Sequence, residues 1–280
     1  MLYNGTYGRY TITLPLKLID FFTLKIGRWL ISSFTNFFSA LQFTLVVLFR
    51  GLRYTSRSPK NNIVHQVTLT QIIFSGIDAF FPTLFLLSLL VGLAITSPLI
   101  LFLQSFATDQ EVITMLTHFI GLQLSSIITS IILIARSGSA IAVDLGNMSI
   151  RQEIKGLLLL GIDPYVYFAY PRFIGLAISH IALTVYFAVL SMLFGVFFAA
   201  LESPTNFKYF SVLLESFDSI ELALFILKNA CCGIAIAAYA CFFGLNVKAS
   251  VTEVPQATQQ AIIKSLMLVF FINALFVLIP

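Results

Sequence analysis

The chain has 280 residues, of which 59% are apolar and only 10% are charged. Soluble globular domains carry about 25% charged residues, and the 12 acidic and 16 basic side chains of this protein are too few to cover a soluble surface of its size. The composition excludes a water-soluble enzyme, a disordered tail and a disulfide-rich secreted module, and it places most of the chain in lipid.

An apolar run at residues 29–49 lies between two groups of basic residues, within positions 25–28 and within positions 50–60. A membrane crossing by this run would place one basic group on the outer side, against the positive-inside rule. We therefore expect an interfacial or re-entrant elbow helix within a cytoplasmic N-terminal region, residues 1–79, and a sixth membrane span is the alternative.

Five later segments are predicted to be transmembrane helices, because each has about 20 or more residues with few or no charges. They are residues 80–103, 112–135, 173–201, 222–247 and 261–279. The fourth segment contains Lys228 near one end, where its long side chain is expected to reach the headgroups. The fifth segment has Lys264 at its start.

The connections between these segments differ in charge. Connections 104–111 and 202–221 are acidic, whereas 136–172 carries four basic residues and 248–260 carries Lys248. The positive-inside rule places the two connections with basic residues in the cytoplasm, together with the N-terminal region, and places the two acidic ones outside. The predicted fold is an all-α integral membrane protein with a cytoplasmic N-terminus.

One membrane domain, residues 1–280, is expected, because no repeat, low-complexity tract or Pro/Gly-rich linker divides the sequence. It consists of the elbow region 1–79 and a five-helix bundle, 80–280. Small residues recur on one face of the fourth span, at Ala230, Gly233, Ala237, Ala240 and Gly244. Such faces let membrane helices approach closely; packing inside one bundle and contact with a second subunit are both open.

Motifs for catalysis or nucleotide binding are absent from the sequence: it contains no G-x-x-x-x-G-K-[ST], H-E-x-x-H or G-x-S-x-G. Cys231, Cys232 and Cys241 lack zinc spacing and are expected to be packing thiols. His118 and His180 lie inside spans, and a hydrogen bond to a neighbouring helix is the favoured interpretation over a functional role. We expect no catalytic residue, metal, cofactor or nucleic-acid partner for this chain.

The large cytoplasmic connection is the most informative segment. It predicts a helix that leaves the membrane, a turn, and a short amphipathic helix over 149–160 with Ser149 as N-cap and Gly161 as its end. Asp163-Pro164 then starts the return to the membrane. The polar face consists of Arg151, Gln152, Glu153 and Lys155, opposite leucines 157–160. An uncovered apolar face needs lipid or a partner protein, so this helix either lies on the headgroups or docks on a cytosolic motor.

Six short motifs follow one another from the second span to the fifth. They are residues 135–140 (Ala-Arg-Ser-Gly-Ser-Ala), 144–148 (Asp-Leu-Gly-Asn-Met), 152–154 (Gln-Glu-Ile), 161–164 (Gly-Ile-Asp-Pro), 171–172 (Pro-Arg) and 257–258 (Ala-Thr). In this order and spacing they resemble the signature of the MlaE-type permease family, the membrane subunits of ABC transporters that work with MCE lipid-carrier proteins. Span number, elbow and total length agree with this resemblance.

Four positions depart from the family pattern. Asp144 stands where the family usually has Glu, Gln152-Glu153 reverses the family's order, and 250–256 lacks the family's glycines. In the second span, Leu-Gln-Leu-Ser-Ser at 122–126 replaces Arg-Glu-Leu-Gly-Pro. Neutral polar groups therefore take the place of an intramembrane ion pair, which argues against a mechanism that relies on a charge there.

The resemblance implies that two copies of the chain form the membrane core of a transporter that moves phospholipids or related lipids between the inner membrane and an MCE ring. It implies a role in outer-membrane lipid asymmetry, cytosolic ABC ATPase subunits that bind ATP and Mg²⁺, and a small cytosolic STAS-type subunit. The chain itself then has no ATPase site. The implied location is a bacterial inner membrane, with the plastid inner envelope as alternative, and a non-transporting membrane scaffold is the alternative function.

Two sets of candidate site residues follow from this resemblance. The residues expected to couple the chain to an ATPase are Arg136, Gly138, Asp144, Gly146, Met148, Arg151, Glu153, Gly161, Asp163, Pro164 and Arg172. The residues expected to line a lipid cavity are Ile95, Leu99, Phe102, Leu103, Phe106 and Gln123. Arg136 is expected to pair with Asp144 or Glu153 and so stiffen the loop; anchoring to lipid phosphates or helix C-termini is the alternative.

Overall fold

The computed structural model describes residues 35, 37–53, 70, 80–202, 219–248 and 250–278. The chain divides into two compact units, Met1–Leu45 and Val46–Pro280. Residues 37–53 are helical, and this helix crosses the boundary between the units. The other parts of the predicted elbow, 29–34 and residue 36, lie outside the described residues, so the choice between an elbow and a sixth span stays a prediction.

The described part of the second unit is all-helical and contains five segments that are long and apolar enough to cross a membrane. They are Pro82–Leu103, Gln110–Ile150, Tyr165–Glu202, Ile220–Leu245 and Glu253–Val277. The five predicted spans are therefore confirmed, and the protein is a multi-pass membrane protein. Lipid leaves backbone polar groups no partner outside the chain, which is why each crossing is a helix.

Short π-helical segments, here called η, occur in the first three of these segments. The first segment consists of α3 (Phe80–Val91), η1 (Gly92–Thr96) and α4 (Ser97–Leu103). The second consists of α5 (Asp109–Leu116), η2 (Thr117–Leu124), α6 (Ser125–Leu133), η3 (Ile134–Gly138) and α7 (Ser139–Ile150). The short helix α8 (Glu153–Leu159) follows, and then η4 (Tyr165–Ala169), α9 (Tyr170–Glu202), α11 (Ser219–Leu245) and α12 (Glu253–Val277).

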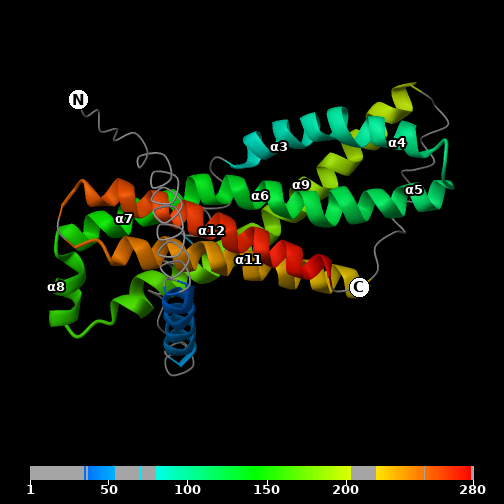
Figure 1. Cartoon of the computed structure of the whole chain (residues 1–280). Coiled ribbons are helices and arrows are strands. Elements are labelled where there is room, and N and C mark those ends of the chain that lie inside the picture. The colour runs from blue at the N-terminus through cyan, green and yellow to red at the C-terminus, as the bar shows by residue number, and fades with distance from the viewer. Residues whose placement is uncertain are drawn as a thin grey trace, which may run out of the picture. The chain divides into compact units, whose positions relative to one another are not determined.

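The second and third segments are much longer than the spans predicted inside them. They contain 41 and 38 residues, which at 1.5 Å per residue correspond to about 60 Å, twice the thickness of a hydrocarbon core of about 30 Å. In Figure 1, α7 and α8 lie at the end of the bundle opposite the turn between α4 and α5. The predicted helix leaving the membrane after Arg136 is thus a direct continuation of the second span.

The fifth helix also starts earlier than predicted. It begins at Glu253 rather than at residue 261, so that Lys264 lies well inside the helix and not at its start. The motif at 257–258 accordingly lies within the first turns of α12. The prediction placed the start too late because it followed hydropathy alone, and polar residues such as Gln259 and Gln260 continue a helix once it has left the bilayer.

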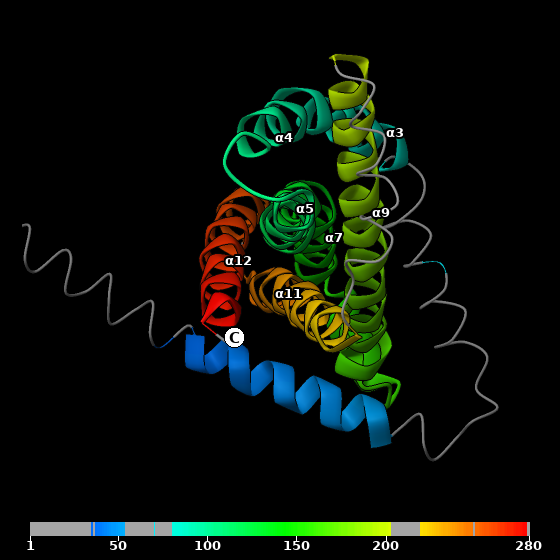
Figure 2. The same cartoon turned by 90° about the vertical axis from the view of Figure 1, so that its right-hand side faces the viewer.

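Close helix packing centres on α11, which contacts α9, α7 and α12. Figure 2, which views the bundle end-on, shows α11 between α12 and α9. A Cβ atom added at Gly233 would lie 2.7 Å from both Ala177 Cα and Leu176 O, and one added at Gly244 would lie 2.8 Å from Leu145 Cβ. The small-residue face of the fourth span therefore serves packing inside the bundle, which decides between the two interpretations left open by the sequence.

Both intramembrane histidines contact neighbouring helices, as predicted. His180 on α9 is fully buried, and its Nε2 lies 2.7 Å from the hydroxyl of Ser130 on α6. His118 on η2 is partly exposed, and its Nε2 lies 3.2 Å from the carboxylate of Glu221 at the start of α11. The cysteines of α11 are free thiols, which agrees with their predicted packing role.

Lys228 does not extend towards the headgroups, which corrects the prediction. Its side chain is 3% exposed, and its Nζ donates to Leu122 O (2.7 Å) and to Gln123 Oε1 (3.0 Å) on η2. The next residue, Asn229, accepts a hydrogen bond from the hydroxyl of Ser126 (2.8 Å). The neutral polar segment of the second span thus provides the acceptors that a buried ammonium group requires, and these bonds join α11 to the second span.

We expect Gly233→Ala to lower the thermal unfolding midpoint of the purified protein in detergent. The added methyl group meets backbone atoms of α9 that cannot yield, and overpacking of this kind costs about 1–3 kcal/mol. The matched control is Gly156→Ala on α8, where a Cβ has no atom within 4 Å. Equal midpoints for the two variants would contradict the close packing of α11 on α9.

Candidate functional site

The short helix α8 joins the second and third membrane segments and lies between two residues with left-handed backbone conformation. Gln152 (φ 60°) precedes it and Gly161 (φ 74°) follows it, and these are the positive-φ residues of the described chain. At its C-terminus Ile162 N donates to Leu157 O (3.0 Å) and Gly161 N to Leu158 O (3.1 Å). This pair of bonds is a Schellman motif, which needs glycine at its left-handed position. The predicted end at Gly161 is confirmed.

The predicted start at Ser149 is wrong, because α7 continues through Ile150 and α8 begins at Glu153. The hydroxyl of Ser149 does not cap α8; it donates to Val247 O (2.6 Å), just after the end of α11. The last carbonyl groups of a helix have no partner within it, and this serine supplies one from another part of the chain. Arg151 and Gln152, whose backbone is left-handed, form a turn between α7 and α8 where the sequence predicted the first turn of the short helix.

The outer face of α8 is apolar and uncovered among the described residues. No residue of α8 is buried, and the exposed fractions are 57% for Leu158, 90% for Leu159, 75% for Leu160 and 40% for Ile162. We call these four residues the α8 patch. Ile154 and Leu157, by contrast, are half-buried. A contiguous apolar patch on an exposed helix indicates an interaction surface.

An ion pair between α7 and α9 supports the base of α8. The Arg172 guanidinium donates through Nη2 to the Asp144 carboxylate and lies 5.7 Å from the centre of the Phe168 ring. The Arg172 side chain is 10% exposed, and its Nη1 is buried without a hydrogen-bond partner among the described residues. Asp144 is therefore the main compensation for a largely buried charge.

This ion pair gives Asp144 a partner that the sequence did not predict. Arg136 was expected to pair with Asp144 or Glu153, or to anchor to lipid phosphates or helix C-termini; it lies on η3 with an exposed side chain, and its role stays a prediction. The return of α9 beside α7 brings Arg172 to the Asp144 carboxylate. A buried arginine such as Arg172 also depends more on a carboxylate partner than an exposed arginine does.

Two glycines of the predicted site allow the extension to pack tightly. A Cβ atom added at Gly138 would lie 3.3 Å from Ile236 on α11, and one added at Gly146 would lie 3.2 Å from Val254 on α12. Together with the bond from Ser149 to Val247, these contacts hold α7 against α11 and α12. The extension that carries α8 is therefore packed on two further helices.

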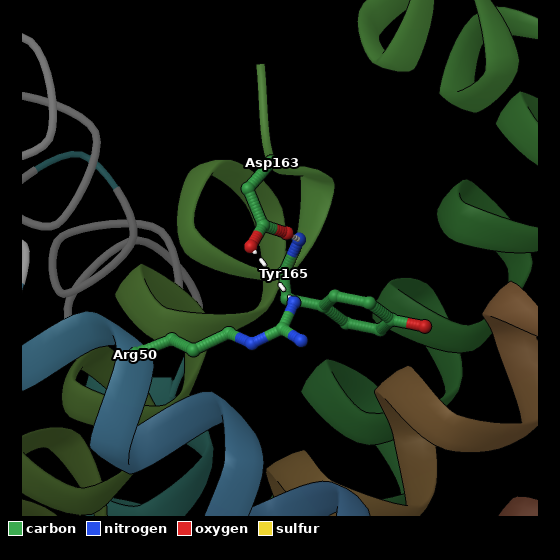
Figure 3. Close-up of polar contacts among 3 residues, drawn as sticks. All are labelled: Arg50, Asp163 and Tyr165. Atoms are coloured by element: carbon green, nitrogen blue, oxygen red, sulfur yellow. Dashed lines mark hydrogen bonds and ion pairs between the residues drawn. The ribbon is translucent and has the colours of Figure 1, made fainter. Parts of the chain in front are cut away.

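The chain returns to the bundle through Asp163 and Pro164. One carboxylate oxygen of Asp163, Oδ1, accepts the backbone N–H of Tyr165 (2.9 Å), and the other, Oδ2, accepts Arg50 Nη1 (3.0 Å). The Arg50 guanidinium also lies 5.6 Å from the centre of the Tyr165 ring (Figure 3). Pro164 is buried. Asp163 thus starts η4 and at the same time anchors the preceding helix.

The structure places the predicted coupling residues along one continuous path. Arg136 and Gly138 lie on η3; Asp144, Gly146 and Met148 on α7; Arg151 in the turn; Glu153 on α8; Gly161, Asp163 and Pro164 in the return; and Arg172 on α9. It brings Asp144 and Arg172 into direct contact. Sequence reasoning missed Ser149 as a link to α11, and it treated Arg50 only as part of a basic topology signal.

The predicted cavity residues fall into two places. Ile95, Leu99, Phe102, Leu103 and Phe106 lie together from η1 to the turn after α4, and the rings of Phe102 and Phe106 are 5.2 Å apart between centres. Gln123 lies on η2, where its side chain accepts a hydrogen bond from Lys228. A lipid cavity at these residues stays a prediction. The described residues contain no cluster of three or more His, Cys, Asp or Glu side chains that suits a metal ion.

We expect Asp144→Asn to destabilise the protein more than Glu153→Gln. The first change removes the charge that compensates the buried Arg172, and a buried donor that loses its partner costs about 1–3 kcal/mol. Glu153 is exposed at the start of α8, so its neutralisation serves as the control. Thermal unfolding in detergent measures both, and equal midpoints would contradict a structural role for the Asp144–Arg172 pair.

Comparison with known proteins adds independent information. A probable ABC transporter permease protein of Synechocystis is 25% identical over 152 residues, which are 54% of this chain and 58% of that protein. The chloroplastic protein TRIGALACTOSYLDIACYLGLYCEROL 1 of Arabidopsis thaliana is 27% identical over 192 residues, 66% of this chain and 53% of that protein. A probable ABC transporter permease protein of Rickettsia conorii is 20% identical over 208 residues, 74% of this chain and 80% of that protein.

The chain thus spans little more than half the length of the first two relatives. Residues 68–279 match the family described as Permease MlaE. This range contains all five membrane segments, α8 and the ion pair between α7 and α9. Because the match covers well over half of its length, the chain belongs to the MlaE permease family.

Proposed function

We propose that the chain is the transmembrane permease subunit of an ABC transporter that moves phospholipids or related lipids between the inner membrane and an MCE-protein ring. Through this transport it contributes to the lipid asymmetry of the outer membrane. The observation that carries the proposal is the α8 patch, four exposed apolar residues at the end of a helical extension. The family membership and the relatives named as ABC transporter permeases support it.

The position of α8 favours a protein partner over the membrane surface. About 20 residues of the second segment suffice to cross the bilayer, and the segment has 41. The 15 residues from Arg136 to Ile150 add about 20 Å of helix beyond the span. This length is sufficient to carry the α8 patch away from the headgroups, where a cytosolic ATPase can cover it.

Force transmission requires that α8 does not move independently of the spans. Four contacts meet this requirement: Asp144 with Arg172, Ser149 with Val247, Gly146 against Val254, and Asp163 with Arg50. Closure of two ATPase subunits would displace α8, and through these contacts α7, α9 and α11 would move with it. In this proposal α8 acts as the coupling helix, and Arg151 and Glu153 are the charged residues closest to its start.

The complete transporter contains two copies of the chain, two cytosolic ABC ATPase subunits and an MCE-domain protein on the outer side, with a small STAS-type subunit in the cytosol. The ATPase subunits bind ATP and Mg²⁺, and this chain has no ATPase site of its own. We place the complex in a bacterial inner membrane, with the N-terminus in the cytoplasm. The plastid inner envelope is the alternative location, because one relative is a chloroplastic protein. The name of that relative contains the name of a lipid, trigalactosyldiacylglycerol.

On the outer side, the exposed apolar residues at the end of the first span are the proposed contact for lipid chains. A lipid pocket is largely apolar with few polar contacts, and Phe102 and Phe106 at 62% and 76% exposure offer such a surface. Outward-facing apolar residues can equally face the bilayer. Substitution of Phe102 and Phe106 therefore tests the lipid cavity separately from the coupling helix.

A liposome assay separates this proposal from a non-transporting scaffold. The complex purified with its ATPase and MCE partners is reconstituted, and transfer of fluorescent phospholipid between the vesicles and the MCE protein is measured with ATP and with a non-hydrolysable analogue. A permease gives transfer that requires hydrolysis. A scaffold assembles the same complex but gives equal transfer under both conditions, and that result would falsify the proposal.

We expect Leu159→Glu to abolish stimulation of the ATPase and to weaken its binding about tenfold or more. In the proposed complex the ATPase buries this apolar side chain, and the variant replaces it by a charge. The matched control is Leu278→Glu, which changes a residue of similar exposure, 83% against 90%, beyond the end of α12. Binding is measured by co-purification and by titration of the ATPase. Wild-type binding by Leu159→Glu would contradict docking at α8.

Charge reversal at the start of α8 provides a second test. We expect the double variant Arg151→Glu, Glu153→Arg to retain the ATPase subunits but to lower the lipid transferred per ATP hydrolysed. Both side chains are exposed, so their reversal affects complementarity with a partner more than folding. Unchanged transfer and unchanged hydrolysis in this variant would count against the orientation of α8 proposed here.

A further inference from the structure

Arg50 lies near the end of the helix formed by residues 37–53, in the part that belongs to the second compact unit. Arg50 and Asp163 are 113 positions apart in the sequence, yet the guanidinium reaches this carboxylate directly. Figure 3 shows the guanidinium between the Asp163 carboxylate and the Tyr165 ring. The contact joins the helix before the first span to the return of the chain after α8.

The contact has three independent components. Arg50 Nη1 donates to Asp163 Oδ2 at 3.0 Å, and the guanidinium lies 5.6 Å from the centre of the Tyr165 ring. One residue further on, a Cβ atom added at Gly51 would lie 1.9 Å from Tyr170 Cδ2, so the backbone of this helix rests directly on the start of α9. The guanidinium thus combines an ion pair with a cation–π contact, and its planar shape and several donors distinguish it from a lysine ammonium group.

The Asp163 carboxylate makes two contacts: one oxygen forms the turn at the start of η4, and the other binds Arg50. Its Oδ1 accepts the N–H of Tyr165 and so sets the first turn of η4, while its Oδ2 is held by Arg50. An aspartate that accepts the N–H two residues later forms an Asx-turn. Rotation of the carboxylate away from Tyr165 would break the bond from Oδ2 to Arg50, so this ion pair favours the direction in which the chain leaves α8.

The helix α8 has little else to fix its direction. None of its residues is buried, and left-handed residues stand at both of its ends. The connection on its N-terminal side is tied by Ser149 to Val247. On its C-terminal side the corresponding tie is Asp163 with Arg50.

We infer that Arg50 is a positioning residue for α8, acting through Asp163, so that residues 46–53 and the coupling helix move as one body during transport. This inference rests on the proposed function of α8 as the contact to the ATPase. It adds that the helix before the first span is part of the coupling apparatus and not only a topology signal.

The variants are chosen to separate the ion pair from the Asx-turn. Arg50→Gln removes the charge and the planar fork. Asp163→Asn keeps an oxygen for the Tyr165 N–H but loses the charge that binds Arg50, whereas Asp163→Ala loses both. Arg53→Gln, an exposed basic residue on the same helix, is the matched control.

Hydrogen–deuterium exchange of the purified permease tests the positioning directly and needs neither ATP nor transport. We expect Arg50→Gln and Asp163→Asn each to raise the exchange rates of the backbone amides in 161–167 about two- to fivefold, as for loss of an exposed ion pair. Asp163→Ala raises them further than Asp163→Asn. The double variant Arg50→Gln, Asp163→Asn is no worse than Arg50→Gln alone, because the same ion pair is lost, and Arg53→Gln matches wild type.

The reconstituted complex tests the consequence for transport. We expect Arg50→Gln to keep ATPase binding but to transfer about half as much lipid per ATP, or less, in line with a loss of this size. Wild-type exchange rates in Arg50→Gln overturn the inference whatever the transport result. If the wild-type complex transfers no lipid upon hydrolysis, the proposed function fails while the exchange result still stands. If exchange rises but lipid per ATP is unchanged, coupling through Arg50 is refuted and the proposed function is not affected.

Discussion

About 20 helical residues cross a bilayer, but the second and third membrane segments contain 41 and 38. The surplus turns have to leave the lipid, and apolar residues that leave it need cover from protein. Much of that cover comes from the chain itself: α7 packs through Gly146 on Val254, and Gly244 of α11 packs on Leu145 of α7. The α8 patch lies at the tip of this extension, where the described residues provide no cover. The exposure of the α8 patch, which makes it the candidate functional site, depends on this mismatch between helix length and membrane thickness.

Within the bundle, apolar burial provides no driving force between helices, because lipid chains are as apolar as leucine. Close approach at glycine and hydrogen bonds between helices take its place. Gly233 brings α11 to the backbone of α9, while Ser126 with Asn229 and Ser130 with His180 link α6 to α11 and α9. These contacts give the spans a defined arrangement.

The buried ammonium group of Lys228 is bound by neutral groups of the neighbouring helix. The second span has no charge at 122–126, and a mechanism based on an ion pair within that segment has no residues to perform it. The cation comes instead from α11, and a carbonyl oxygen and an amide oxygen of η2 bind it. The interior of the bundle therefore retains a charged group, held by neutral acceptors on the neighbouring helix.

Predictions based on local pattern were reliable where local physics decides the outcome. The five spans follow from runs of apolar residues, and the end of α8 follows from Gly161, since only a residue without Cβ adopts its backbone conformation at no cost. Predictions about individual partners were less reliable. Ser149 was assigned to the N-cap of the following helix and Lys228 to the headgroups, and no partner on a distant helix was predicted for Asp144. The structure gives all three a partner at least 28 positions away.

The sequence by itself determined that this is a five-span membrane protein with a short helix between the second and third spans, and its motif order indicated the MlaE permease family. Hydropathy, charge asymmetry and glycine positions are properties of the local chain, so they can be read without a fold. Only the tertiary structure decided which side chains meet: Arg172 with Asp144, Arg50 with Asp163, and Lys228 with Gln123. Such pairs form when helices that are distant in sequence return side by side, and no local pattern encodes that register.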